Sequence, residues 1–273
     1  GQLNRPVLPD IPGVDSFAGQ WCHSAAWDDS IDCRGKKVVV VGSGASAFQL
    51  VPTIAGDVGQ LTVFQRSAPW MFENPIYHEE VPQGKKWCLQ NLPFYTRWFR
   101  FLIFWPACDG AYDTVFVDPE WPHQERSINE MNDFVYQMFF DHIKGQVGDD
   151  EELLKKVTPD YAPMGKRTLQ DNGSWLSALK RDNVDLVTQG VASVSAGGVT
   201  ASDGTFYPAD IVIYATGFET DKFLWPMEIK GRGGKLLSDK WGIEPSAYLG
   251  ITVSDFPNFY CMYGPGTNLA FGG

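Results

Sequence analysis

The stretch that decides the fold is Lys36–Ser67, which reads KKVVVVGSGASAFQLVPTIAGDVGQLTVFQRS. Its four consecutive valines are typical of a strand in a parallel sheet that is covered on both faces. We therefore predict a strand over Lys36–Val41, a helix over roughly Ala45–Ala55 and a second strand over Leu61–Gln65. This order makes a βαβ unit, so the chain is expected to have an α/β, Rossmann-like fold.

A glycine-rich turn joins the first strand to the helix and fits the pattern G-x-G-x-x-G/A. In this pattern Gly42 permits a tight turn, Gly44 lets the backbone approach a pyrophosphate, and Ala47 keeps the helix close to the strand. The N–H groups at the start of the helix would bind the anion. The pattern is weak alone, but its place in a βαβ unit predicts a dinucleotide site. Its residues are Gly42, Ser43, Gly44, Ala45, Ser46 and Ala47.

The end of the second strand indicates which dinucleotide is bound. An NAD site places a carboxylate there for the ribose 2′-hydroxyl, whereas this chain has Gln65-Arg66-Ser67. The guanidinium of Arg66 and the hydroxyl of Ser67 suit a 2′-phosphate, so we predict NADP. The alternative is that Arg66 is simply a solvated residue at a strand end.

Composition narrows the class of protein. The net charge of −11 argues against nucleic-acid binding, which needs a basic surface. The five scattered cysteines form no C-x-x-C pair, which favours a reducing, cytoplasmic compartment without a disulfide framework or zinc site. The histidines also lack ligand spacing, so we expect no metal. The apolar stretch Phe94–Pro106 is too short to span a membrane. We expect it to pack internally; lining a substrate channel or touching a membrane surface are the alternatives.

The rest of the chain divides into segments of different character. Residues 1–35 are rich in Pro and Gly and read as an extended linker, whereas residues 76–165 read as a helical, aromatic-rich insertion. Strand patterns resume at Val184–Val187 and Ala192–Val194. A hairpin is expected around Ser202–Gly204, and a buried strand at Asp210–Tyr214 ends in Ala215, Thr216 and Gly217.

A second motif lies in the linker and matches F-x-G-x-x-x-H-x-x-x-W-[PD]. A purely structural interpretation is open for it: a buried Phe, a hydrogen-bonded His and a Trp that fills a domain junction. Spacing alone assigns no chemistry to the histidine. The matching residues are Phe17, Gly19, His23, Trp27 and Asp28.

With these two motifs, and with the segments PDYAPMGKRTLQDNGSW, DIVIYATGF and FPNFYCMYGPGTNL, the chain resembles type I Baeyer–Villiger monooxygenases. These belong to the flavin-containing monooxygenase group, and the 4-hydroxyacetophenone branch is the nearest match. The resemblance implies a flavoprotein in which an NADP-binding domain, here 36–75 and 166–214, is inserted into an FAD-binding domain. Residues 215–273, beginning with Ala215, Thr216 and Gly217, would be a partial return to the FAD domain. The family's FAD fingerprint is absent, so we expect a fragment.

The resemblance also implies a reaction and the residues that perform it. NADPH would reduce FAD, and O2 would then form a C4a-peroxyflavin that converts a ketone to an ester or lactone. Arg167 would face the flavin, where a permanently charged guanidinium stabilises anions, and Lys166 would hold the 2′-phosphate. Three alternatives remain: a solvated Lys-Arg pair, an N- or S-oxygenating enzyme, and an inactive NADP-binding fragment.

Overall fold

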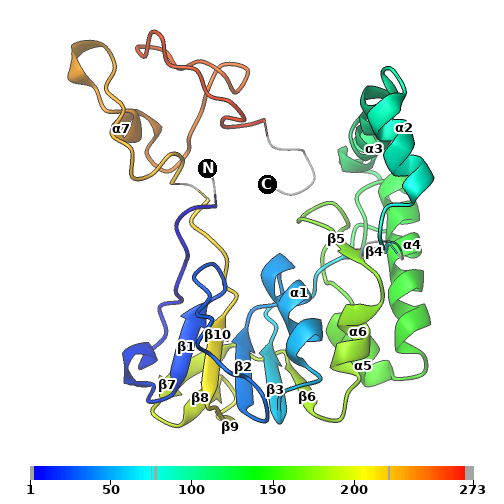
Figure 1. The fold of residues 1–273 in the computed structure, drawn as a ribbon, viewed down its shortest axis with the longest axis vertical. Coiled ribbons are helices and arrows are strands. Elements are labelled where there is room, and N and C mark those ends of the chain that lie inside the picture. Colours follow the sequence, from blue (N-terminus) through cyan, green and yellow to red (C-terminus); the bar gives the residue numbers. More distant parts are fainter. Residues whose placement is uncertain (1–2, 75, 77–78, 221, 268–273) are drawn as a thin grey trace. The chain divides into compact units, whose positions relative to one another are not determined.

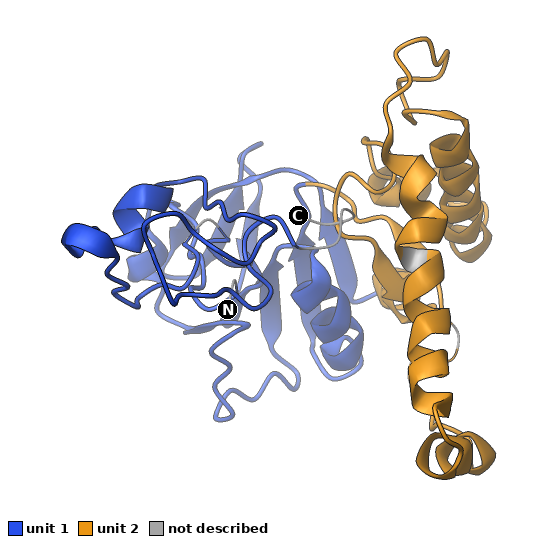
Figure 2. Cartoon of the chain, turned by 90° about the horizontal axis from the view of Figure 1, so that it is seen from above, with its two compact units in different colours: residues 1–66, 181–268 blue, residues 67–180, 269–273 orange. Residues whose placement is uncertain are grey.

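The computed structural model describes residues 3–74, 76, 79–220 and 222–267 (Figure 1). It divides into two compact units (Figure 2). The first unit comprises Gly1–Arg66 and Arg181–Asn268, and the second comprises Ser67–Lys180 and Leu269–Gly273.

The centre of the first unit is a five-stranded parallel sheet with the order β1-β10-β2-β3-β6. Val38 of the central strand pairs with Leu61 on one side and with Ile211 on the other. Val38, Val39 and Val40 of that strand are buried and Val41 is half-buried, which confirms the expected α/β fold and its covered parallel strand. The strands are β1 (Gln20–His23), β2 (Lys37–Val41), β3 (Gln60–Phe64), β6 (Val184–Val187) and β10 (Ile211–Tyr214).

Helix α1 (Ala45–Ile54) connects β2 to β3 and completes the βαβ unit. Ala47, Phe48 and Val51 are the buried residues of this helix, at the i, i+1 and i+4 spacing that places them on one face. The helix and both strands lie within a residue of their predicted positions. Local periodicity was therefore sufficient to define this unit.

An antiparallel meander covers part of the sheet. It contains β7 (Val191–Ser195), β8 (Gly198–Ala201) and β9 (Phe206–Pro208), and the turn predicted at Ser202–Gly204 joins the last two strands. The meander and the sheet share one hydrophobic cluster, which also includes Phe17, the residue after the short 3-10 helix η1 (Val14–Ser16). The cluster residues are Phe17, Val39, Phe64, Val187, Val194, Val199, Ala201, Val212 and Tyr214.

The segment predicted as a linker, residues 1–35, differs from expectation because it contributes strand β1. Gln20 pairs with Ile211 in parallel, and the Trp21 ring meets the Tyr214 ring edge-on at a centroid distance of 6.0 Å. The four residues QWCH are too few for a periodic pattern, and the Pro and Gly residues around them indicate only loops. Pairing with β10, far along the chain, makes this segment a strand.

The second unit is mainly helical, as predicted for residues 76–165. The two short strands β4 (Met71–Glu73) and β5 (Leu169–Asp171) pair in parallel and bring its two ends together. Trp70 and Trp175 are fully buried in its core. The helices are α2 (Gln83–Asn91), α3 (Tyr95–Ala107), η2 (Asp109–Val115), α4 (Glu130–Val147), α5 (Glu151–Val157) and α6 (Ser174–Leu179).

The apolar stretch Phe94–Pro106 forms α3, but the prediction that it packs internally is wrong. Trp98, Leu102 and Trp105 each expose about half or more of their surface, at 58%, 51% and 51%. Among the described elements, α2 and η2 are the principal neighbours of this helix, and much of its surface stays exposed. Among the described residues, no helix is both long and apolar enough to cross a bilayer.

After β10 the chain of the first unit is mostly irregular. A small cluster of Leu237, Trp241, Val253, Phe256 and Cys261 holds this part together around the short helix α7 (Leu237–Trp241), with η3 (Arg232–Gly234) nearby in sequence.

Candidate functional site

The glycine-rich turn has a backbone that only glycine fits at its first position. Gly42 has a φ of 116°, and a Cβ built on it would lie 2.5 Å from the carbonyl oxygen of Ala215. The Ala215 N–H in turn donates to the Val41 carbonyl at 2.9 Å. The turn after β2 and the turn after β10 therefore touch, and a side chain at Gly42 would force them apart.

The second glycine faces open space. A Cβ built on Gly44 would meet no atom within 4 Å, and Gly44 is the N-cap of α1 with no side chain capping the helix. Ala47, by contrast, is completely buried. An uncapped helix start beside an open glycine is a place where backbone N–H groups can receive a phosphate. The residues of the turn thus fit a dinucleotide pyrophosphate.

The carboxyl ends of all five parallel strands meet at this same edge of the sheet, and β2 lies where strand order reverses. Open α/β sheets bind ligands at such a point. The backbone of Gly217 follows β10 with a φ of 83°, and its carbonyl accepts from Val7 N–H at 3.0 Å. The Thr216 hydroxyl donates to the Val7 carbonyl. The Ala215–Gly217 turn therefore forms one wall of the candidate site.

His23 stands at the end of β1 on this edge and is only 4% exposed. Its Nδ1 accepts a hydrogen bond from Ala25 N–H at 3.1 Å, which places the ring proton on Nε2. Nε2 is buried without a hydrogen-bond partner among the described residues. Burial lowers the pKa of His23, and the nearby Gly217 carbonyl offsets only part of this effect. The ring is therefore a neutral, incompletely satisfied donor beside the Ala215–Gly217 turn.

The other residues of the linker motif have structural roles. Phe17 belongs to the core cluster, and a Cβ at Gly19 would lie 2.4 Å from the Asp210 carbonyl oxygen. Asp28 accepts from Ser30 N–H at 2.8 Å in a tight turn, and the Ser30 hydrogen bonds lower its pKa. Trp27 is 40% exposed, so it does not fill a buried junction within the described part of the chain.

Arg66 and Ser67 lie just after β3, with Gln65 between, at the carboxyl edge of the sheet. Arg66 is exposed and is the last residue of this stretch of the first unit, whereas Ser67 begins the second. Within the second unit, Lys166 donates to the Ser67 hydroxyl with an Nζ–Oγ distance of 3.1 Å. Two residues that the sequence analysis selected for a 2′-phosphate are thus neighbours, although 99 positions separate them in the chain.

The aromatic ring of Tyr161 lies against Lys166 and helps to position it beside Ser67. Lys166 Nζ lies 4.3 Å from the centre of the Tyr161 ring, and the Tyr161 hydroxyl donates to the Ala68 carbonyl at 3.1 Å. A cation over an aromatic face gains electrostatic attraction while its N–H groups stay available. The ring therefore holds the ammonium group near Ser67. No pattern in the sequence indicated this contact.

Arg167 is exposed, and its guanidinium makes no ion pair or hydrogen bond with the residues that the structure describes. Its segment leads into β5, where Leu169 N–H donates to the Trp70 carbonyl at 2.9 Å. The Arg167 guanidinium is therefore a permanent positive charge that is accessible to a ligand. The segment that carries it is held at its far end by the hydrogen bond of Leu169.

The anchor of that segment is a buried polar network that sequence reasoning missed. Asp171 is fully buried, and its Oδ2 lies 3.0 Å from His142 Nε2 and 2.8 Å from Gln146 Nε2. Its Oδ1 accepts from Gly173 N–H at 3.0 Å. His142 and Gln146 lie one turn apart on α4, and that i, i+4 spacing was the only available signal. The network ties the end of β5 to α4.

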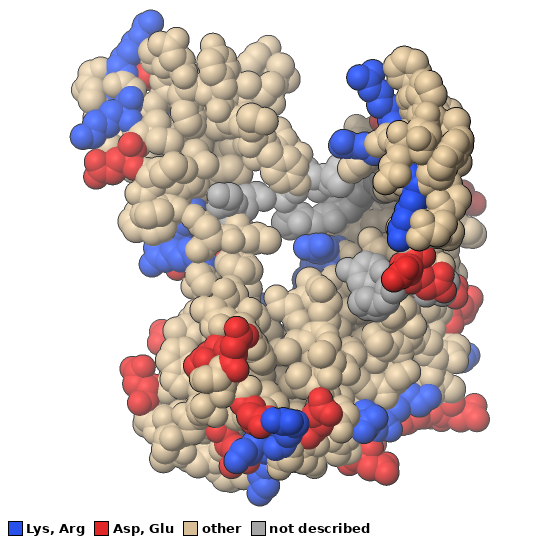
Figure 3. Space-filling model, viewed as in Figure 1, with Lys and Arg blue, Asp and Glu red and all other residues tan. Residues whose placement is uncertain are grey.

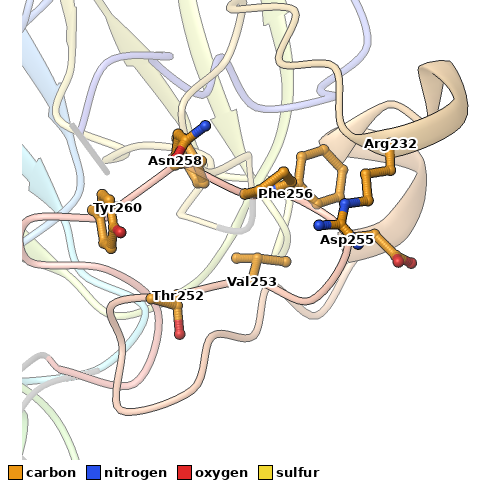
Figure 4. Close-up of a pocket in the computed structure, with 9 residues that line it drawn as sticks. Arg232, Thr252, Val253, Asp255, Phe256, Asn258 and Tyr260 are labelled. Carbon is orange, nitrogen blue, oxygen red and sulfur yellow. The ribbon is translucent and has the colours of Figure 1, made fainter.

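A separate open pocket of about 300 Å³ lies in the irregular part of the first unit (Figure 4). Arg232 and Asp255 lie at one end of it and Tyr260 at the other. The Asp255 carboxylate already binds Lys235 at 2.9 Å, which lowers its pKa. None of the residues predicted for the site lines this pocket, so we assign it no role in the reaction.

Comparison with known proteins gives consistent matches over the whole chain. The chain is 38% identical over 274 residues to the uncharacterized monooxygenase y4iD of Sinorhizobium fredii, covering 100% of this chain and 41% of that protein. It is 34% identical to a Baeyer–Villiger monooxygenase of Streptomyces coelicolor, covering 98% of this chain and 49% of that one. A solved structure, OTEMO in complex with FAD and NADP, matches with a TM-score of 0.78 and 27% identity over 100% of this chain and 56% of its own. No family model matches the chain.

The chain therefore has homologues among Baeyer–Villiger and other flavin monooxygenases, and it spans about half of their length. Its fold corresponds to one portion of a two-domain flavoprotein.

Proposed function

We propose that this chain is the NADP-binding part, with adjoining segments, of a type I Baeyer–Villiger monooxygenase that uses NADPH, FAD and O2 to convert a ketone into an ester or lactone. The observation that carries this proposal is the contact between the Gly42 turn and the Ala215–Gly217 turn at the carboxyl edge of a parallel sheet. The similarity to a Baeyer–Villiger enzyme over 98% of this chain, which spans 49% of that enzyme, supports the same reaction class.

The turn Gly42–Ala47 binds the pyrophosphate of NADP through the free N–H groups at the start of α1. Arg66, Ser67 and Lys166 receive the 2′-phosphate, with Tyr161 keeping the Lys166 ammonium beside Ser67. Two cations and a hydroxyl bind a phosphate through charge-assisted hydrogen bonds, which a 2′-hydroxyl cannot match. The site therefore prefers NADPH over NADH.

When bound, FAD would supply the redox chemistry, namely hydride acceptance from NADPH and activation of O2. Ala215, Thr216 and Gly217 would hold this cofactor from the first unit. Arg167 stabilises the negative charge that develops on oxygen during attack on the ketone. Arginine suits this task because its guanidinium stays protonated and cannot donate a proton prematurely.

We further propose that the enzyme belongs to the 4-hydroxyacetophenone branch and accepts aryl ketones. The resemblance of the segments around Phe17–Asp28 and Lys166–Arg167 supports this assignment. Turnover of an aryl methyl ketone, compared with that of a cyclic aliphatic ketone, tests it on the purified full-length protein.

Substitution of Arg167 tests the proposed reaction. In R167A of the full-length protein, ester formation should fall about 100-fold or more, because removal of one oxyanion-stabilising group costs that much. Anaerobic reduction of the flavin by NADPH should persist, and an R34A control, which removes an exposed arginine distant in sequence, should retain both activities. Unchanged ester formation in R167A would contradict the role of Arg167. Efficient oxygenation of amines or sulfides without any ester product would favour an N- or S-oxygenating enzyme instead.

A further inference from the structure

The second unit carries a helical hairpin, residues 83–107, whose apolar side chains face solvent. It consists of α2 (Gln83–Asn91) and α3 (Tyr95–Ala107), joined through Phe94, which has a φ of 62°. No described residue of either helix is buried. Exposed apolar patches of this kind mark surfaces that contact something else. We call this element the aromatic hairpin.

The exposed side chains of α3 form a continuous stripe. Trp98, Phe101, Leu102 and Trp105 stand at the i, i+3, i+4 and i+7 spacing of one helix face. The ring centroids of Trp98 and Phe101 are 5.3 Å apart, and those of Phe101 and Trp105 are 5.5 Å apart. Trp87 of α2 is similarly exposed. The hairpin therefore presents three tryptophans and further apolar groups together.

The hairpin is also basic within an acidic chain. It contains four basic residues and no Asp or Glu, although the net charge of the chain is −11. Lys86 faces a neighbouring carboxylate, that of Glu80, at 4.0 Å, and this carboxylate is itself almost fully exposed. Figure 3 shows the basic groups among uncharged residues on this part of the surface. The basic residues are Lys85, Lys86, Arg97 and Arg100.

Several of these cations lie over the aromatic rings of the hairpin. Lys85 Nζ is 4.1 Å from the centre of the Phe99 ring, and the Arg97 and Arg100 guanidinium carbons are 5.8 Å from Phe94 and 5.9 Å from Phe104. The charged groups thus lie against aromatic faces at the surface of the hairpin, and Arg97 and Arg100 remain exposed. Basic and aromatic groups therefore lie side by side on this surface, as they do at the boundary between lipid and water.

We propose that the aromatic hairpin docks on an anionic lipid surface, with α3 lying in the plane of the interface. A short helix with Trp, Phe and Leu on one face and Lys or Arg beside them binds in this manner. Tryptophan favours the headgroup region, and the basic residues attract anionic headgroups. A helix of 13 residues can lie on a bilayer but cannot cross it.

Charge favours lipid over a protein occupant. Two of the four cations are lysines, which are depleted in protein–protein interfaces. A phospholipid surface with negative headgroups satisfies both the apolar stripe and the cations.

The test is flotation of the purified full-length protein with vesicles. We expect it to bind phosphatidylcholine vesicles that contain about one third phosphatidylserine, and to bind pure phosphatidylcholine much more weakly. Raising the salt from about 0.1 M to about 1 M should release it, since the Debye length falls from about 10 Å to about 3 Å. W98S/F101S/W105S should lose at least about tenfold in binding, through loss of buried apolar area.

A second variant and a matched control separate the contributions. K85Q/K86Q/R97Q/R100Q should weaken binding to anionic vesicles by up to about fivefold per charge removed, but leave the weak binding to neutral vesicles unchanged. The control M131S/F134S/M138S removes an exposed apolar stripe of the same length from α4, where acidic residues flank it, and should bind like the wild type.

Three results would overturn the proposal. The first is that the wild type binds neither kind of vesicle. The second is that the stripe variant binds as well as the wild type. The third is light scattering that shows a dimer which W98S/F101S/W105S converts to a monomer, because a second copy would then cover the stripe. Circular dichroism of each variant confirms that it is folded.

Discussion

The two units hold their candidate residues in different ways. In the first unit the glycine turn is held by backbone packing: the chain after β2 touches the chain after β10, and little at Gly42 can change. In the second unit Lys166 and Arg167 are exposed side chains on a segment that is anchored only at its ends. A pyrophosphate is bound by backbone N–H groups in fixed positions, whereas the two cations of the second unit are exposed side chains. The difference suggests which substitutions should damage folding and which should damage only binding.

The largest effect is expected at the rigid turn. G42V should destabilise the protein by about 3 kcal/mol or more, because the valine backbone must hold a positive φ and its side chain must clash with the Ala215 carbonyl. Urea denaturation of the full-length protein measures this loss. G44A, in open space, should cost less than about 1 kcal/mol in stability yet weaken NADPH binding at least about tenfold, since its methyl group meets the pyrophosphate. Equal losses of stability in G42V and G44A would contradict the view that only the first glycine is sterically required by the fold.

The second largest effect is expected from a substitution in the buried network around Asp171 in the second unit. D171A removes the buried carboxylate that His142, Gln146 and the Gly173 N–H share, and should cost about 3 kcal/mol because the remaining donors stay buried. Thermal unfolding measures it, with D149A on the exposed surface as the control. If D171A were as stable as D149A, the network could not be what anchors β5.

A smaller effect is expected for Lys166, because it is exposed. K166A should leave the free energy of unfolding within about 0.5 kcal/mol of the wild type. It should weaken NADPH binding about tenfold through loss of a charge-assisted contact and leave NADH binding unchanged. Isothermal titration with both nucleotides measures this, and K155A on α5 is the control. A parallel loss of NADH affinity would show that Lys166 does not read the 2′-phosphate.

The smallest effect concerns pH. Burial lowers the pKa of His23 in the folded protein. Between the two pKa values the unfolded chain therefore binds a proton at His23 and the folded chain does not. Stability from this group is therefore complete above about pH 6.5 and declines as pH falls from there toward the folded pKa, by up to about 1.4 kcal/mol for each pH unit between the two pKa values. Denaturation of wild type and H23N between pH 5 and pH 8 should show a shallower slope in the variant, within roughly that range. Identical slopes would contradict a neutral, buried His23.

Sequence alone determined the parts of the fold in which neighbours along the chain decide conformation. The valine run, the glycine pattern and the helix after it defined β2, α1 and β3 to within a residue, because β-branched runs and glycine turns act locally. The hairpin at Ser202–Gly204 and the helical character of residues 76–165 followed in the same way. The candidate residues of the glycine turn were also selected from a local pattern, whereas the roles given to Lys166 and Arg167 came from the resemblance to the family.

Only the tertiary structure decided which of these segments meet. It placed β1 beside β10, brought the Ala215 carbonyl against Gly42, and set Lys166 beside Ser67 across 99 positions of chain. It also left the stripe of α3 exposed, although its helical periodicity is the same as that of a buried helix. Periodicity reports which face of an element is apolar, but what covers that face depends on the elements that fold against it, and these come from distant parts of the chain.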